Sequence, residues 1–159
     1  MDDRRLIQDM QQLLNQQLSH EAEIQLDQRC DALEQMAAML HPYPIPYVRK
    51  VVILGCYYLL HHAILRHREL QDCEADHPDE SLAKTILDGD YMLGVYFQMA
   101  NLMDENRLIA HLTSAYKRIQ IKLIHGTSIE DALALLPQEI IDFLEGESSK
   151  SGGDTDEAA

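Results

Sequence analysis

The chain has 159 residues, of which 46% are hydrophobic and 25% are charged, a size and composition that suit one folded domain. Asp and Glu outnumber Lys and Arg by 27 to 13, giving a net charge of −14, so a nucleic-acid partner is disfavoured. Seven Gly, five Pro and no Trp are few turn residues for a multi-stranded β protein and favour an all-α fold.

No pattern in the chain predicts disulfides, secretion or a membrane span. The three cysteines are odd in number, far apart and never in a Cys-x-x-Cys pair, which argues against a disulfide framework or a zinc site. The N-terminal residues lead into an amphipathic stretch rather than an apolar signal core. The longest apolar run, 51–60, is followed by two histidines and is shorter than the ~20 apolar residues that a membrane span needs. We therefore expect a cytoplasmic protein with no stable membrane insertion.

The first two expected helices show one-sided burial. Apolar side chains recur at three- and four-residue steps over 4–19 and again over 24–40, which is typical of helices packed along one face. Residues 19–23 offer capping groups for the second helix. Three prolines within 41–46 end that helix, because proline lacks an N–H and disfavours helical geometry in the residue before it.

The third expected helix runs from Pro46 to about Leu70. Proline suits the first position of a helix, where a missing N–H costs nothing. Residues 51–60 are apolar on every helical face, which predicts the central helix of a bundle. The polar and acidic stretch 71–78 is expected to be a loop.

A fourth helix is expected to end near Leu102, with Asp79 or Ser81 as its cap. Gly89 and Gly94 lie inside it, where each costs about 1 kcal/mol relative to alanine. Close contact with another helix is the expected reason for both glycines.

Three shorter helices are expected after a turn at 103–106. Gly126 is placed to end a helix over 107–125, and Thr127 or Ser128 can cap a short one. Pro137 is expected to begin the last helix.

The composition changes after the last expected helix, which should end near 144. Ser, Gly and acidic residues dominate the remainder, and such a segment cannot bury enough apolar surface to fold. We expect a single helical domain over 1–145 and a disordered acidic tail over 146–159.

The histidines do not have the spacing of a metal site. A helix presents two ligands to one metal best at i and i+3 or i+4, and no pair among His61, His62 and His67 has that separation. His77 lies in the expected loop. We expect these histidines to be satisfied structurally, and a small metal-dependent enzyme is the weakest of three functional hypotheses. Phosphate-binding loops and nucleophile elbows are also absent from the sequence.

Two segments resemble the trans-prenyltransferases, an all-helical family of polyprenyl diphosphate synthases. Residues 59–72 read LLHHAILRHRELQD and residues 86–97 read ILDGDYMLGVYF. The family's corresponding helices have the forms L-I-H-x-A-S-L-I-H-D-D-x-x-D and I-L-x-G-D-Y-L-L. The matching residues are Leu59, His61, Ala63, Leu65, His67, Asp72, Ile86, Leu87, Gly89, Asp90, Tyr91 and Leu93. The resemblance implies a helical bundle like a truncated isoprenoid synthase fold.

The chain departs from the family at the residues that bind metal. In the family, aspartates at i, i+1 and i+4 hold Mg²⁺ ions that bridge to a substrate diphosphate. The corresponding residues of this degenerate first Asp-rich motif are Arg68, Glu69 and Asp72, and Arg68 can pair with Asp72 instead. The following Arg-Arg-Gly and a second DDxxD are absent, and the chain stops near the middle of a full-length synthase. The resemblance therefore implies no catalytic or metal-binding residue in this chain.

Within the same superfamily, two-component synthases make hexaprenyl or heptaprenyl diphosphate for menaquinone, and this chain resembles their small subunit, called component I. That resemblance implies a heterodimer with a full-length catalytic subunit, which would bind Mg²⁺, while this chain supports elongation and product-length control. A truncated bundle should also leave an apolar helix face uncovered, which usually marks a partner interface. The candidates for the interface or for a chain-lining wall are Tyr57, Tyr58, Asp90, Tyr91, Tyr96, Phe97 and Met99, although an ordinary core position is favoured for most of them.

A second hypothesis stays open beside the synthase subunit. The same acidic, helical composition fits a cytoplasmic adaptor or regulatory protein with a prenyltransferase-like half-fold and no prenyl diphosphate activity. In either case Asp88 and Asp90 are expected to be helix-face acids or hydrogen-bond acceptors at an interface rather than metal ligands, since residues two apart point to different helix faces.

Overall fold

The computed structural model describes residues 2–18, 24, 26, 30–72 and 80–151, without the side chains of 70–72, 80 and 81. Within this part of the chain every regular element is an α-helix, which confirms the all-α prediction. The helices are α1 (Asp3–Gln17), α2 (Asp31–Leu40), α3 (Tyr47–Asp72), α4 (Glu80–Leu102), α5 (Asn106–Ile124), α6 (Ile129–Leu133) and α7 (Leu135–Ser151).

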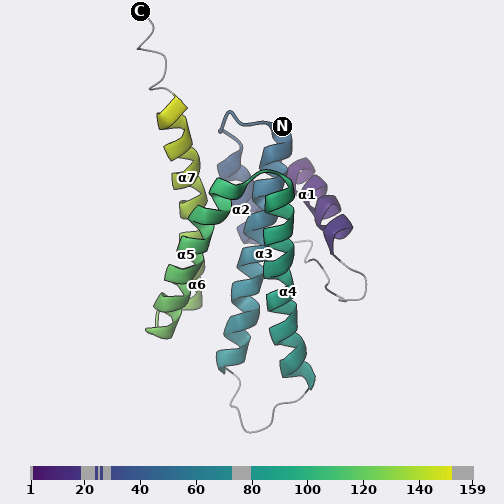
Figure 1. The fold of residues 1–159 in the computed structure, drawn as a ribbon, viewed down its shortest axis with the longest axis vertical. Helices are drawn as coiled ribbons and strands as arrows, with labels where there is room; N and C mark the ends of the chain where they lie inside the picture. Colours follow the sequence, from purple (N-terminus) through teal and green to yellow (C-terminus); the bar gives the residue numbers. More distant parts are fainter. Residues whose placement is uncertain (1, 19–23, 25, 27–29, 73–79, 152–159) are drawn as a thin grey trace, which may run out of the picture.

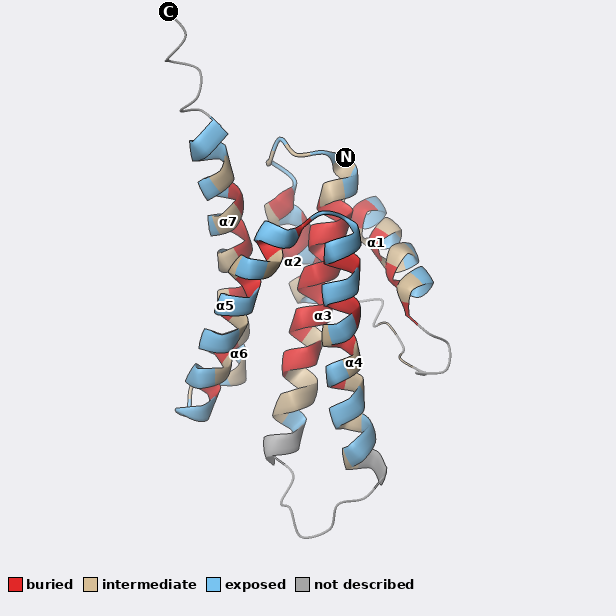
Figure 2. Ribbon diagram, in the orientation of Figure 1, coloured by how far each residue is buried: buried red, intermediate tan, exposed pale blue. Residues whose placement is uncertain are grey.

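Helix α3 is the centre of the bundle, as its apolar sequence predicted. Every residue from 51 to 60 is buried, and Figure 2 shows the continuous buried stretch along α3. Helix α4 lies antiparallel beside it, α1 and α2 cover its first half, and α5, α6 and α7 form a separate group on the side away from α1 (Figure 1). The span Tyr47–Glu69 is long and apolar enough to cross a membrane by length and composition, but 78% of its most apolar window is buried inside the fold. Its apolar character is therefore used for helix packing.

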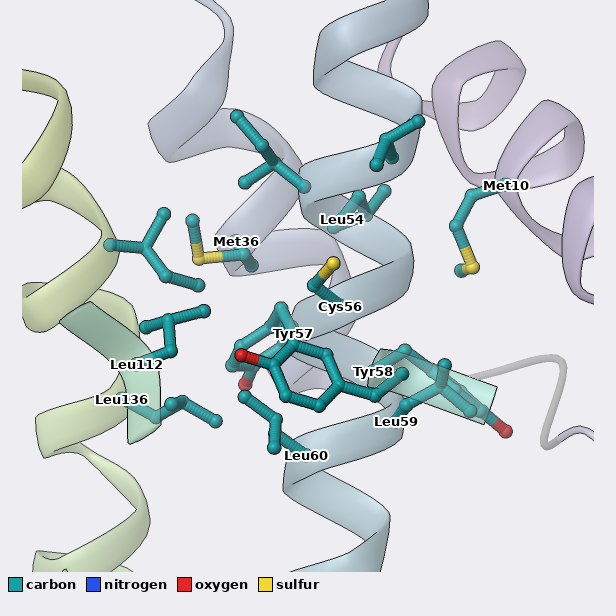
Figure 3. Packing of buried hydrophobic residues seen from close by; sticks show 14 of the residues in the cluster. Met10, Met36, Leu54, Cys56, Tyr57, Tyr58, Leu59, Leu60, Leu112 and Leu136 are labelled. Atoms are coloured by element: carbon teal, nitrogen blue, oxygen red, sulfur yellow. The ribbon is translucent and has the colours of Figure 1, made fainter. Parts of the chain in front are cut away.

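Side chains from most of the other helices meet around the middle of α3. Figure 3 shows Met10 of α1, Met36 of α2, Leu112 of α5 and Leu136 of α7 around Cys56. Burial raises the pKa of the Cys56 thiol, which keeps it protonated and chemically inert at neutral pH.

Several helix boundaries follow the predicted signals. The Ser128 hydroxyl accepts a hydrogen bond from the Asp131 amide at 3.2 Å and caps α6. Gly126 ends α5 with φ of +92°, a left-handed conformation that favours glycine. The Pro46 carbonyl accepts from the Lys50 amide at 3.1 Å, so α3 begins directly after the prolines.

The start of the second helix was predicted wrongly. Helix α2 begins only at Asp31, and Ile24 and Leu26 lie outside any helix although they pack partly buried against the core. These two residues therefore add apolar surface to the core without being helical themselves. The proposed capping groups at 19–23 lie outside the described residues, as do 73–78 of the expected loop, and α3 itself continues to Asp72.

The expected end of the last helix near 144 is also wrong. Helix α7 begins at Leu135 and continues to Ser151, so residues 146–151 are helical rather than part of a disordered tail. The physical reason is that two carboxylates beyond Leu144 are bound by the body of the protein. The Tyr43 hydroxyl donates to Glu145 at 2.9 Å, and Arg49 donates to Glu147 at 2.8 Å. Residues 152–159 lie outside the described part of the chain.

Candidate functional site

The two segments of the sequence signature lie next to each other, because the end of α3 packs against the beginning of α4 (Figure 1). His67 Nε2 lies 3.1 Å from Asp90 Oδ1 on α4. The other ring nitrogen, Nδ1, lies 3.1 Å from the Tyr116 hydroxyl on α5. One imidazole therefore links three helices at this end of the bundle.

Gly89 makes room for this imidazole. A Cβ atom at position 89 would lie 2.7 Å from His67 Nε2 and 2.9 Å from its Cδ2, which is closer than van der Waals contact allows. The prediction of a close approach is confirmed for Gly89. It is wrong for Gly94, because a Cβ there would have no neighbour within 4 Å and the residue is exposed.

The described acidic side chains near the degenerate motif each pair with a different neighbour. Glu69 is exposed and lies 3.4 Å from Arg66, and Arg68 is half-buried. Asp88 pairs with Lys84 on its own helix at 2.8 Å, whereas Asp90 faces His67. Asp72 is the last residue of α3, but its side chain, and so its expected pairing with Arg68, lies outside the described residues.

This set of donors does not fit a magnesium–diphosphate site. Mg²⁺ requires several oxygen ligands in near-octahedral geometry, and an arginine side chain supplies none at position 68. Among the described residues, no group of three or more His, Cys, Asp or Glu side chains is close enough to hold a metal ion.

His61 is buried in the core and His62 is half-buried beside it. His61 is buried, and its Nδ1 lies 3.4 Å from the Tyr57 hydroxyl. Burial lowers the pKa of His61, so the ring is held neutral. His62 packs against the Tyr58 ring with centroids 4.2 Å apart. His77 lies outside the described residues.

Most of the aromatic and methionine candidates are core residues. Tyr57 and Tyr58 point into the packed interior (Figure 3), and burial raises the pKa of Tyr57 to about 12. Tyr96 and Met99 are each 1% exposed. These four side chains are buried in the fold, and Tyr96 also lines the small pocket described below.

The remaining three candidates lie on α4. Tyr91 is half-buried, whereas Asp90 and Phe97 are exposed. Exposed residues follow one another along α4 at alternating steps of four and three, and we call this row the α4 seam. It consists of Ala83, Leu87, Asp90, Gly94, Phe97 and Asn101.

A small apolar pocket adjoins the α4 seam. It has a volume of about 70 Å³ and is lined by Leu93, Tyr96 and Phe97 of α4, with the remaining wall from Leu60 of α3 and from Leu112, Thr113 and Tyr116 of α5. The pocket continues the apolar surface of Phe97 towards α5.

Sequence reasoning missed one partly buried ion-pair cluster. Arg49 Nε donates to Glu105 at 2.6 Å and Arg49 Nη1 donates to Glu147 at 2.8 Å, which fastens α7 and the turn before α5 to the start of α3. These hydrogen bonds raise the pKa of Arg49. Its partners lie 56 and 98 residues away in sequence, so no local pattern could have paired them.

The chain matches no protein-family model, no curated protein and no solved structure.

Proposed function

We propose that this chain is the non-catalytic small subunit of a heterodimeric polyprenyl diphosphate synthase that makes hexaprenyl or heptaprenyl diphosphate. The observation that carries the proposal is the arrangement at the end of α3. The two signature segments meet there through His67 and Asp90, while Arg68 occupies the position where the family has its first metal-binding aspartate.

The electrostatics at this site argue for a supporting role. Ionisation of an allylic diphosphate needs cations that neutralise the leaving group, and carboxylates are the side chains that collect Mg²⁺. Here Glu69, Asp88 and Asp90 each have a cationic or imidazole neighbour of their own. The catalytic partner would therefore supply Mg²⁺ and both diphosphate sites, and this chain would complete the assembly.

The role of the chain in such an assembly would be to support elongation and to help set product length, with menaquinone side-chain synthesis as the expected use in the cytoplasm. The exposed side chains of Leu87 and Phe97 in the α4 seam support a role that needs a partner, because exposed apolar surface is a feature of interaction sites. A helical adaptor without prenyl diphosphate activity would share that exposed face, so the identity of the partner separates the two functions.

The test is association with a full-length synthase that carries two Asp-rich motifs and comes from the same organism. Sedimentation velocity of the mixture should show a complex of one or more copies of each chain that neither forms alone. Two independently sedimenting species would contradict the proposal. A stable complex formed only with proteins outside the prenyltransferases would favour the adaptor instead.

A further inference from the structure

The last three helices form a group of their own, which we call the α5–α7 group. Helices α3 and α4 contact each other far more extensively than either contacts α5, α6 or α7, whereas the most extensive contacts of α5 are with α7. Figure 1 shows the three helices together beside the α3–α4 pair. In the described part of the chain the backbone passes between the two groups once, in the turn 103–105. The α5–α7 group is therefore joined to the rest of the fold by a single short turn.

This turn has an unusual backbone conformation and is fixed by polar contacts. Asp104 has φ of +58°, a left-handed conformation that residues with a side chain rarely adopt. The Glu105 amide donates to the Ala100 carbonyl at 2.8 Å, and Arg49 donates to the carboxylates of both Glu105 and Glu147. These contacts hold the α5–α7 group at the end next to the turn, so this end is the pivot of any movement of the group.

The interface of α5 with α3 and α4 is incompletely filled further from the turn. The apolar pocket of about 70 Å³ lies between these three helices, and voids larger than a water molecule are few in a packed core. Tyr96 lines the pocket, and its hydroxyl is buried without a well-formed hydrogen bond. Burial raises the pKa of Tyr96, and an interaction with Thr113 of α5 only partly opposes that rise. A buried hydroxyl without a hydrogen bond costs free energy, so this interface is less stable than a filled one.

A hydrogen bond crosses this interface next to the pocket. Tyr116 lines the pocket, and its hydroxyl lies 3.1 Å from His67 Nδ1 on α3. Helix α5 begins at Asn106, so Tyr116 lies about 15 Å along the helix from its start. The hydrogen bond therefore acts at a distance from the pivot, where a small rotation of the α5–α7 group is enough to break it.

We propose that the α5–α7 group is a lid that pivots at the turn 103–105, with the His67–Tyr116 hydrogen bond as its catch. Opening separates the α5 wall of the apolar pocket from the walls on α3 and α4, so the pocket becomes a cleft that is open to solvent. The Tyr96 hydroxyl then gains water as a hydrogen-bond partner, which lowers the free-energy cost of opening. The lid belongs to this chain alone and does not depend on the identity of a partner.

The test is native-state hydrogen exchange of the full chain, followed at individual amides at low concentrations of denaturant. We expect the amides in the inner turns of α5 and α7 to exchange through a partial opening. The dependence of this opening on denaturant should be smaller than that of global unfolding, because less surface is exposed. The buried amides of α3 should exchange only through global unfolding.

Two tyrosine-to-phenylalanine variants separate opening of the lid from unfolding of the whole chain. Tyr116→Phe removes the catch, which is broken in both processes, so exchange in α3, α5 and α7 alike should become about fivefold faster. Tyr47→Phe removes the hydrogen bond from Tyr47 to Asp9, which joins α3 to α1 and stays intact when the lid opens. This control should therefore speed exchange in α3 by a similar factor and leave exchange in α5 and α7 unchanged.

Three results would overturn the inference. If α5 and α7 exchange with the same denaturant dependence as α3 in the wild-type chain, the lid does not open separately. If Tyr47→Phe speeds exchange in α5 and α7 as much as in α3, the last three helices unfold only with the rest of the fold. If Tyr116→Phe leaves exchange in α5 and α7 unchanged, the hydrogen bond is not the catch. Unfolding midpoints from circular dichroism report whether each variant is folded, and the wild-type pattern with the Tyr47→Phe variant decides the question if Tyr116→Phe is not.

Discussion

Replacing Gly89 with alanine should destabilise the protein, whereas the same replacement at Gly94 should stabilise it. Alanine in a helix is favoured over glycine by about 1 kcal/mol at either position. At position 94 nothing opposes this gain, because no atom lies within 4 Å of the new Cβ. At position 89 the new Cβ would lie 2.7 Å from His67 Nε2, so the imidazole must rotate away from Asp90 and Tyr116.

The magnitude follows from the contacts that the imidazole loses. Two hydrogen bonds of about 1 kcal/mol each outweigh the helix gain and leave Gly89→Ala destabilised by about 1 kcal/mol. The two variants should therefore differ by about 2 kcal/mol in free energy of unfolding, or by roughly 4–8 °C in Tm for a chain of this size. Urea unfolding followed by circular dichroism measures the difference.

A double replacement tests the cause rather than the size of the effect. In a His67→Ala background the obstacle to a Cβ at position 89 is gone, so Gly89→Ala should become stabilising, as it is at position 94. If Gly89→Ala remained destabilising without the His67 ring, the imidazole link between α3, α4 and α5 would not be the reason that glycine is needed there.

Three further changes have defined outcomes. Arg49→Met leaves two carboxylates without their cation and should cost about 2–3 kcal/mol of unfolding free energy. Arg118→Met removes a half-exposed ion pair and should cost less than about 1 kcal/mol. Equal losses of unfolding free energy in urea titrations would show that the lower exposure of the Arg49 ion pairs does not make them stronger. Burial lowers the pKa of His61 in the folded state, so the unfolded chain binds an extra proton there and stability should fall as the pH drops below the ordinary histidine pKa of about 6.5. His61→Phe should reduce this pH dependence. If the slope of unfolding free energy against pH between pH 5 and 7.5 were unchanged in His61→Phe, His61 would not be its source. The double variant Arg68→Asp, Glu69→Asp should release no diphosphate from an allylic substrate when assayed alone, because the second DDxxD and the Arg-Arg-Gly are still missing. Detectable release of diphosphate would show that the chain does not need these groups for catalysis.

Local sequence signals predicted helix boundaries correctly where a residue next to the boundary sets it. Gly126 and Ser128 act on backbone groups next to them, so their effect can be read from the sequence. The apolar run 51–60 could only be satisfied by burial on all sides, and α3 is indeed the central helix.

The features that sequence reasoning missed depend on distant partners. The C-terminal helix extends past Leu144 because Arg49, nearly a hundred residues earlier, binds Glu147. Composition alone indicated disorder there, since it takes no account of tertiary ion pairs. Gly94 looked like a packing glycine in the sequence, and only its open surroundings show that nothing in the described chain packs on it.

The candidate site was predicted in part. The sequence singled out the segments around His67 and Asp90 without predicting a contact between them, and in the structure His67 Nε2 lies 3.1 Å from Asp90 Oδ1. Tyr57, Tyr58, Tyr96 and Met99 could not be separated from Phe97 by sequence, because buried and exposed positions on α3 and α4 carry the same residue types.

The most direct test of the account is product analysis of the reconstituted pair. The purified chain, a full-length synthase with two Asp-rich motifs from the same organism, and their mixture are each given an allylic diphosphate, isopentenyl diphosphate and Mg²⁺, and the lengths of the products are measured by mass spectrometry. The account predicts no elongation by this chain alone and long-chain prenyl diphosphate from the mixture, longer than any product of the synthase alone. Elongation by the chain alone, or identical products with and without it, would contradict the account.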